Sequence, residues 1–100
     1  MKHFVIRLYV AGGTQAARQA EASLRQLMSA AEVSLDLEVI DVLAHPTAAE
    51  AAGVLSTPLL VREEPGPRRR IIGDLTDCAR LADALGVNYA RTAMVETPER

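Results

Sequence analysis

The side chains best suited to binding chemistry are arginines in a proline-rich stretch that runs from Leu55 to Leu75. Arg68, Arg69 and Arg70 directly follow the segment Pro65-Gly66-Pro67. Guanidinium groups donate several hydrogen bonds in a fixed fork, which suits them to bind carboxylates and phosphates. On composition alone, the default interpretation of the cluster is a solvated charge run, and the alternative is one positive face that binds a partner.

Two further arginines are expected to add to this surface. Arg62 lies on the other arm of a predicted hairpin, and Arg18 lies in the first predicted helix. The net charge of −2 means that any attraction must be local. Only 3% of the residues are aromatic, which argues against nucleic acid because single strands bind by stacking. A protein with an acidic surface is the predicted partner.

Other reactive side chains do not form a catalytic set. Cys78 is the single cysteine, so neither an intramolecular disulfide nor a dithiol pair is possible, and a buried inert thiol is expected. The turn Gly12-Gly13-Thr14 lacks the thiolate that a redox site needs and the lysine of a phosphate-binding loop. His3 and His45 have no ligand cluster. The sequence predicts no enzyme activity, no cofactor and no metal.

Length and composition indicate one small domain over residues 1–100. Apolar residues make up 49% of the chain, and these are mainly aliphatic. No apolar run approaches the roughly 20 residues of a membrane span, and no signal-peptide core follows Met1. We therefore expect a cytoplasmic protein without membrane contact. The tail from 87 to 100 has weak periodicity and is expected to be poorly ordered or to depend on the state of the fold.

The first half of the chain must position these groups through a strand, a helix and a second strand. Phe4 to Val10 alternates as a strand does, and apolar residues recur at helical spacing from Thr14 to Ala31. Thr14 is the expected N-cap. A second strand is predicted from Leu35 to Leu43. Strand, helix and strand in this order imply a right-handed parallel unit.

The second half adds a short helix, a hairpin and a last helix. The short helix is predicted from Pro46 to Ala52, and the hairpin opens at Thr57-Pro58. The last helix is predicted to start after a cap at Asp74 or Thr76 and to end at Gly86. The predicted order is βαβαββα, an α/β fold with the layout of a thioredoxin-like sheet covered by helices.

The hairpin is expected to resist a single geometry. Pro58, Pro65 and Pro67 each follow a peptide bond with a reduced preference for the trans form. Gly73 permits backbone angles that other residues avoid. The sequence therefore predicts that the hairpin loop adopts more than one backbone geometry.

At this point the residues resemble the KaiB family. The resemblance covers about Phe4 to Leu85, and five blocks stand in the order and spacing of that family. They are Leu8-Tyr9-Val10-Ala11-Gly12, Thr14 entering a helix, Val39-Ile40-Asp41-Val42-Leu43, Thr57-Pro58, and Arg69-Arg70-Ile71-Ile72-Gly73-Asp74-Leu75. The last block is the most specific.

The resemblance implies a non-enzymatic regulator that binds KaiC, a RecA-like hexameric ATPase, in a circadian clock or a simpler timing or stress system. It also implies two folds, namely an oligomeric ground state with the order βαββααβ and a thioredoxin-like monomer that binds the ATPase. Gly73 and Asp74 then match positions that bias this switch, and Arg62, Arg69 and Arg70 match positions that contact the ATPase.

Several points stay open at this stage. The family's arginine in the first helix aligns with Gln19, beside Arg18. The ground state can be a dimer or a tetramer, and a KaiA-like third partner is an open question. The alternative function is a fixed thioredoxin-like sensor or docking domain, related to those of clock histidine kinases.

Overall fold

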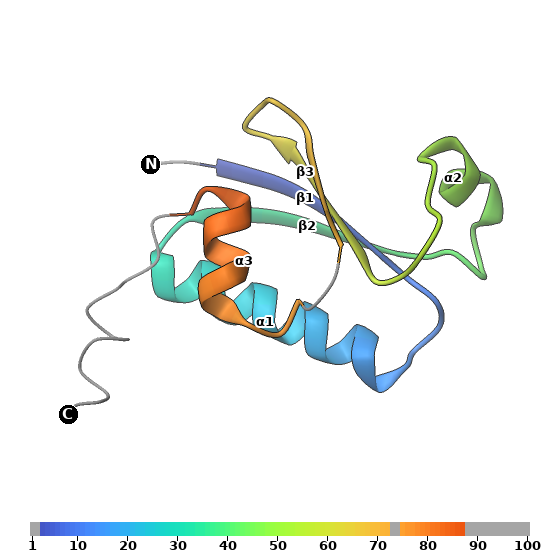
Figure 1. The fold of residues 1–100 in the computed structure, drawn as a ribbon, viewed down its shortest axis with the longest axis horizontal. Coiled ribbons are helices and arrows are strands. Elements are labelled where there is room, and N and C mark those ends of the chain that lie inside the picture. Colours follow the sequence, from blue (N-terminus) through green and yellow to red (C-terminus); the bar gives the residue numbers. More distant parts are fainter. Residues whose placement is uncertain (1–2, 73–74, 88–100) are drawn as a thin grey trace.

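β1 (His3–Val10) is one of the two inner strands of the sheet. Its fully buried residues Phe4, Ile6 and Leu8 alternate with Val5 and Arg7, as the sequence predicts. A computed structural model describes residues 3–72 and 75–87 (Figure 1). The described elements after β1 are α1 (Gln15–Ala31), β2 (Ser34–Asp41), α2 (Pro46–Ala51), β3 (Leu59–Glu64), β4 (Arg69–Ile72) and α3 (Cys78–Leu85). The predicted order βαβαββα is confirmed, and the alternative βαββααβ is not the arrangement of this structure.

The sheet is mixed, with the strand order β2-β1-β3-β4. β1 pairs with β2 in parallel and with β3 antiparallel, and β3 pairs with β4 antiparallel. The parallel pair is connected through α1, as the crossover prediction requires. The antiparallel pair β3 and β4 forms the predicted hairpin around residues 65–68.

The two faces of the sheet are covered differently. The helices α1 and α3 lie over one face of the sheet (Figure 1). There, their apolar side chains pack against those of the strands. This main core contains Phe4, Ile6, Leu8, Leu24 and Leu60, all fully buried. On the outer face, a smaller cluster of Tyr9, Leu59 and Val61 is covered by the segment that joins α2 to β3. The rest of the outer face bears charged side chains.

The helix boundaries follow from local capping. Thr14 caps α1 as predicted, because its hydroxyl accepts from the amide of Ala17 at 3.1 Å. The predicted cap of α3 was wrong. Asp77, and neither Asp74 nor Thr76, is the N-cap, since its carboxylate accepts from the amides of Ala79 and Arg80.

The strand β2 ends two residues earlier than the sequence predicts. The carbonyl of Asp41 accepts from the amides of Ala44 and His45, which turns the chain away from the sheet. Its carboxylate accepts from the amides of Gly12 and Leu43, each at 2.9 Å. Asp41 thus joins the end of β2 to the turn that follows β1, where Gly12 has a positive φ of 74°.

These amide hydrogen bonds, led by that of Gly12, lower the pKa of Asp41 below its ordinary value. A carboxylate with a lowered folded-state pKa stabilises the fold above its unfolded pKa, and this contribution is lost as the pH falls through the folded value. We predict that Asp41→Asn lowers the urea midpoint at pH 7, and that its difference from wild type narrows below about pH 4. The control is Asp36→Asn, because Asp36 lies exposed on the same strand, and its urea midpoint should stay close to that of wild type. A difference independent of pH would contradict the assignment.

Candidate partner-binding site

The hairpin distributes its arginines over both faces of the sheet. In β4, Arg69 lies on the helix-covered face and Arg70 on the outer face, because successive residues of a strand point to opposite sides. Arg62 shares the helix-covered face with Arg69, its partner in the register, and Arg68 lies on the outer face. The expectation of one positive face is therefore wrong for this arrangement.

The carboxyl end of α3 depends on two of these arginines. The last carbonyl groups of a helix lack partners within the helix. Those of Ala82 and Asp83 accept from the backbone amides that follow. The carbonyl of Ala84 accepts from Arg69 Nη1 at 2.8 Å, and that of Leu85 from Arg62 Nη1 at 2.6 Å. All four final carbonyls are satisfied, although the last turn of α3 has no basic residue of its own.

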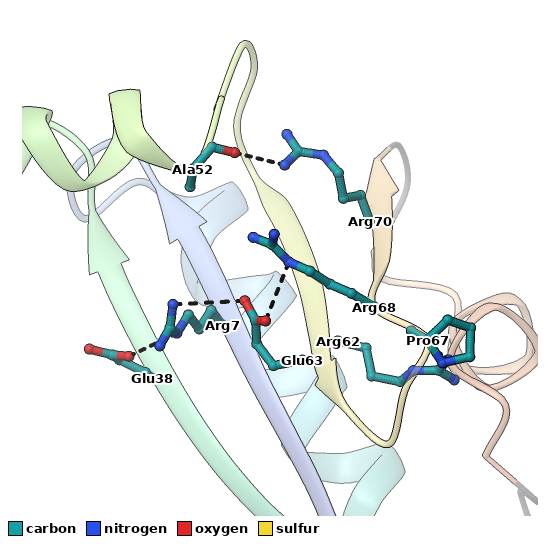
Figure 2. Close-up of polar contacts among 8 residues, drawn as sticks. All are labelled: Arg7, Glu38, Ala52, Arg62, Glu63, Pro67, Arg68 and Arg70. Atoms are coloured by element: carbon teal, nitrogen blue, oxygen red, sulfur yellow. Dashed lines mark hydrogen bonds and ion pairs between the residues drawn. The ribbon is translucent and has the colours of Figure 1, made fainter.

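Arg62 is buried, with 7% of its surface exposed. Its second terminal nitrogen, Nη2, donates to the carbonyl of Pro67 at 2.8 Å (Figure 2). The guanidinium thus joins β3, the hairpin loop and α3. Its Nε atom has no partner among the described residues. The predicted contact of Arg62 with a partner stays a prediction, and in this fold the residue has an internal role.

Arg70 donates hydrogen bonds to the carbonyl groups at the carboxyl end of α2, as Arg62 and Arg69 do at the end of α3. Its Nη1 donates to the carbonyl of Ala52 at 2.8 Å (Figure 2). Its Nη2 donates to the carbonyl of Gly53 at 2.9 Å. These carbonyls directly follow α2, which also lacks a basic residue in its last turn. Because residues 52–54 cover Tyr9 and its neighbours, Arg70 also secures the smaller core.

A charged ladder crosses the outer face from β2 to the start of β4. It consists of Glu38, Arg7, Glu63 and Arg68, with one residue from each strand or its edge (Figure 2). Arg7 Nε lies 3.3 Å from Glu38 and Arg7 Nη1 3.8 Å from Glu63, whose other oxygen lies 3.3 Å from Arg68 Nε. The hydrogen bond with Tyr9, together with these carboxylates, raises the pKa of Arg7.

Sequence patterns alone do not reveal this ladder. Within it, the side chain of Glu63 is only 22% exposed. The charged residues of β1, β2 and β3 were the available signal, but the pairing register was needed to show which of them lie side by side. Each such exposed pair contributes about 0.2–1 kcal/mol, so the ladder modestly supports the strand order.

The other predicted residues lie on α1, directly before β3, in the hairpin loop, or outside the described residues. Arg18 is exposed in the first turn of α1 and donates to the carbonyl of Gly13. The peptide bonds before Pro58, Pro65 and Pro67 are cis. Gly73 and Asp74, the predicted switch positions, lie outside the described residues, as does the predicted tail beyond Val87. Val87 itself is buried, and its amide bonds to Ala82.

The described residues do not gather a reactive set. Cys78 is half-buried, with its Sγ 3.9 Å from the carbonyl oxygen of Ser23. Among residues 3–72 and 75–87, no three His, Cys, Asp or Glu side chains are placed to hold a metal ion together. No helix in the same part of the chain is long and apolar enough to span a membrane.

An open hollow beside α2 supplies apolar surface next to the hairpin. Its volume is about 620 Å³, and its lining includes Val42, Ala49, Val54 and Leu55. Leu55 is 97% exposed and, on β4, Ile72 is 66% exposed. The outer surface near the hairpin therefore combines arginines with exposed apolar groups, a composition typical of protein interfaces.

The chain is similar in sequence to one family of proteins over most of its length. The KaiB domain family matches residues 7–87. A "Circadian clock oscillator protein KaiB" of Synechococcus sp. (strain RCC307) is 40% identical over 89 residues, which cover 88% of this chain and 81% of that protein. The protein of the same name from Prochlorococcus marinus (strain MIT 9313) is 42% identical over 89 residues, covering 88% of this chain and 75% of that protein.

Solved structures agree on the fold. The N-terminal domain of SasA from Synechococcus elongatus superposes with a TM-score of 0.69 and 27% identity, over 86% of both chains. Mitochondrial thioredoxin 3 from Saccharomyces cerevisiae superposes with a TM-score of 0.65 and 18% identity, over 86% of this chain and 79% of the other. The fold is thus thioredoxin-like, as the order of elements predicted.

The contacts of Arg70 generate a stability prediction. Arg70→Met keeps an apolar stem but removes both hydrogen bonds to the end of α2, so we expect the free energy of unfolding to fall by about 1 kcal/mol. Arg68→Met, which removes one exposed ion pair on the same face, should cost less than about 0.5 kcal/mol. Urea denaturation under identical conditions measures both. An equal or larger loss for Arg68→Met would show that the helix-end contacts do not matter for stability.

Proposed function

Because the chain belongs to the KaiB family, we propose that it is a non-enzymatic regulator that binds a KaiC-type, RecA-like hexameric ATPase in a circadian or simpler timing or stress system. The observation that carries this proposal is the family relation, since relatives about 40% identical over most of the chain are circadian clock oscillator proteins. The arrangement of the hairpin supplies the candidate contacts.

The proposed contacts are the exposed arginines Arg69 and Arg70, which lie on the edge strand β4 and point to opposite faces of the sheet. Arg18 is a separate candidate on α1. Arg69 uses one terminal nitrogen for Ala84 and has further donors for a partner carboxylate. Arg70 uses both terminal nitrogens for the end of α2. Exposed Ile72, two residues after Arg70 and on the same face of β4, adds apolar surface. Electrostatic attraction of this kind mainly raises the association rate and fixes the orientation.

We also propose that the thioredoxin-like arrangement is the form that binds the ATPase, in exchange with an oligomeric ground state of order βαββααβ. The support is the family relation and the sequence of the segment with Pro58, Pro65 and Pro67. The proposed switch positions Gly73 and Asp74 fall in the part that the structure does not describe. A KaiA-like protein and a histidine kinase are further candidate partners.

A second function is favoured by one specific observation, the similarity to the N-terminal domain of SasA. Under this alternative the chain is a fixed thioredoxin-like docking domain. It would then be a monomer at every concentration with one set of NMR signals. A regulator with two arrangements would instead change in oligomeric state on dilution and would yield more bound ATPase complex when Gly73→Ala or Asp74→Arg unsettles the ground state.

The binding proposal is tested with an immobilised KaiC-type ATPase. We predict that the chain binds the hexamer and that Arg69→Glu weakens the affinity by about tenfold or more, because it places a repelling charge against an acidic surface. Arg25→Glu makes the same charge change on α1, where Arg25 pairs with Glu21, and should alter the affinity less than about threefold. Absence of binding by the wild type, Gly73→Ala and Asp74→Arg alike would overturn the proposed function.

A further inference from the structure

Arg62 is a charged residue in an apolar setting. It lies in β3 on the helix-covered face, opposite Ile6 in the register, and no other charged residue in 3–72 and 75–87 is buried as deeply. A buried charge is costly unless hydrogen bonds compensate for it. Here the described partners are carbonyl dipoles of Leu85 and Pro67, with no carboxylate among them.

The geometry of these partners is specific. Leu85 ends α3, where the helix dipole concentrates partial negative charge, and the guanidinium lies against this end. A Cβ added at Gly86 would lie 3.2 Å from Arg62 Nη1, so the backbone and the guanidinium are closely packed. Gly86 has a φ of 76°, which a glycine adopts without strain. The other half of the fork reaches the hairpin loop at Pro67, only five residues away in the chain.

We infer that Arg62 is a positioning residue that makes the hairpin and α3 one body, so that both segments reach a partner in a fixed relative orientation. The naming of that partner rests on the proposed function, whereas the coupling itself does not. Arg69 acts beside it at Ala84, but Arg69 is exposed and makes one bond, so Arg62 carries the larger share.

The geometry gives Arg62 a role that an apolar residue would not have. A Leu or Met in β3 would fill the space between the strand and α3 but would leave the carbonyls of Leu85 and Pro67 without their donor. Lysine would keep the charge but has a single terminal nitrogen, so it does not reproduce a planar fork. At position 62, methionine therefore keeps only the packing, lysine keeps the packing and the charge, and arginine adds the directed hydrogen bonds.

Amide hydrogen exchange of the full chain tests the coupling. In Arg62→Met, exchange in α3 and β4 should accelerate by about tenfold or more, while exchange in α1 and in the β1–β2 pair changes less than about twofold. Arg62→Lys should restore part of the protection. Arg69→Met is the matched control, with an expected acceleration in α3 below about threefold. A uniform acceleration in all elements would mean that Arg62 serves general stability and would overturn the inference.

A second measurement connects the coupling to recognition. With a KaiC-type ATPase immobilised, Arg62→Met should bind at least about tenfold more weakly than wild type, and Arg62→Lys should lie between them. If wild type binds but Arg62→Met keeps full affinity and full α3 protection, the inference fails and the proposed function stands. If the exchange pattern is as expected but wild type does not bind, only the proposed function fails. Should Arg62→Met not fold, Arg62→Lys alone decides, since unchanged α3 protection in it would contradict the need for a fork.

Discussion

The carbonyl groups at the carboxyl ends of two helices need donors, and in this protein guanidinium groups of the β3–β4 hairpin donate to carbonyls there that no described backbone amide reaches. Arg62 and Arg69 serve α3, and Arg70 serves α2. Neither helix has a basic residue in its own last turn. Both helices are short, and helices of this length are not stable alone in water. Their ends therefore depend on the hairpin, and the hairpin in turn gains contacts on both faces of the sheet.

Two parts of the protein are held together by different interactions. The unit formed by β1, α1 and β2 is held mainly by apolar packing, with Leu24 and Leu27 of α1 fully buried against the sheet. The hairpin and α3 add an apolar contribution through Leu60, Leu81 and Leu85, but their relative orientation is set by directed hydrogen bonds. Apolar packing tolerates small shifts, whereas a guanidinium fork between two fixed carbonyls does not.

The order of elements could be predicted because each element has a local pattern, such as the helical spacing from Thr14 to Ala31. The role of Arg62 could not. In β3, Leu59, Leu60 and Val61 are all buried, so the alternation that would indicate which face Arg62 occupies is absent. Likewise, the chain offers neighbouring capping residues before α3, and only the backbone geometry selects Asp77. The charged ladder depends on register, which no single strand encodes. Predictions of the element order, which rest on local patterns, were therefore right, whereas those that need the face of a strand, the pairing register or the backbone geometry before a helix could not be made from residue types.

Arg69 and Arg70 differ in how many of their donors remain for a partner. A guanidinium has five N–H donors, and Arg69 uses one nitrogen for the end of α3, so a carboxylate can bind it without breaking that contact. Arg70 directs both terminal nitrogens at Ala52 and Gly53, and a carboxylate that binds it in a bidentate way must displace them. Contact at Arg69 thus adds to the internal structure, whereas contact at Arg70 competes with the end of α2 and the cover of Tyr9. A carboxylate can therefore bind Arg69 while the contact with α3 is kept, whereas bidentate binding to the neighbouring Arg70 breaks the contacts with the end of α2.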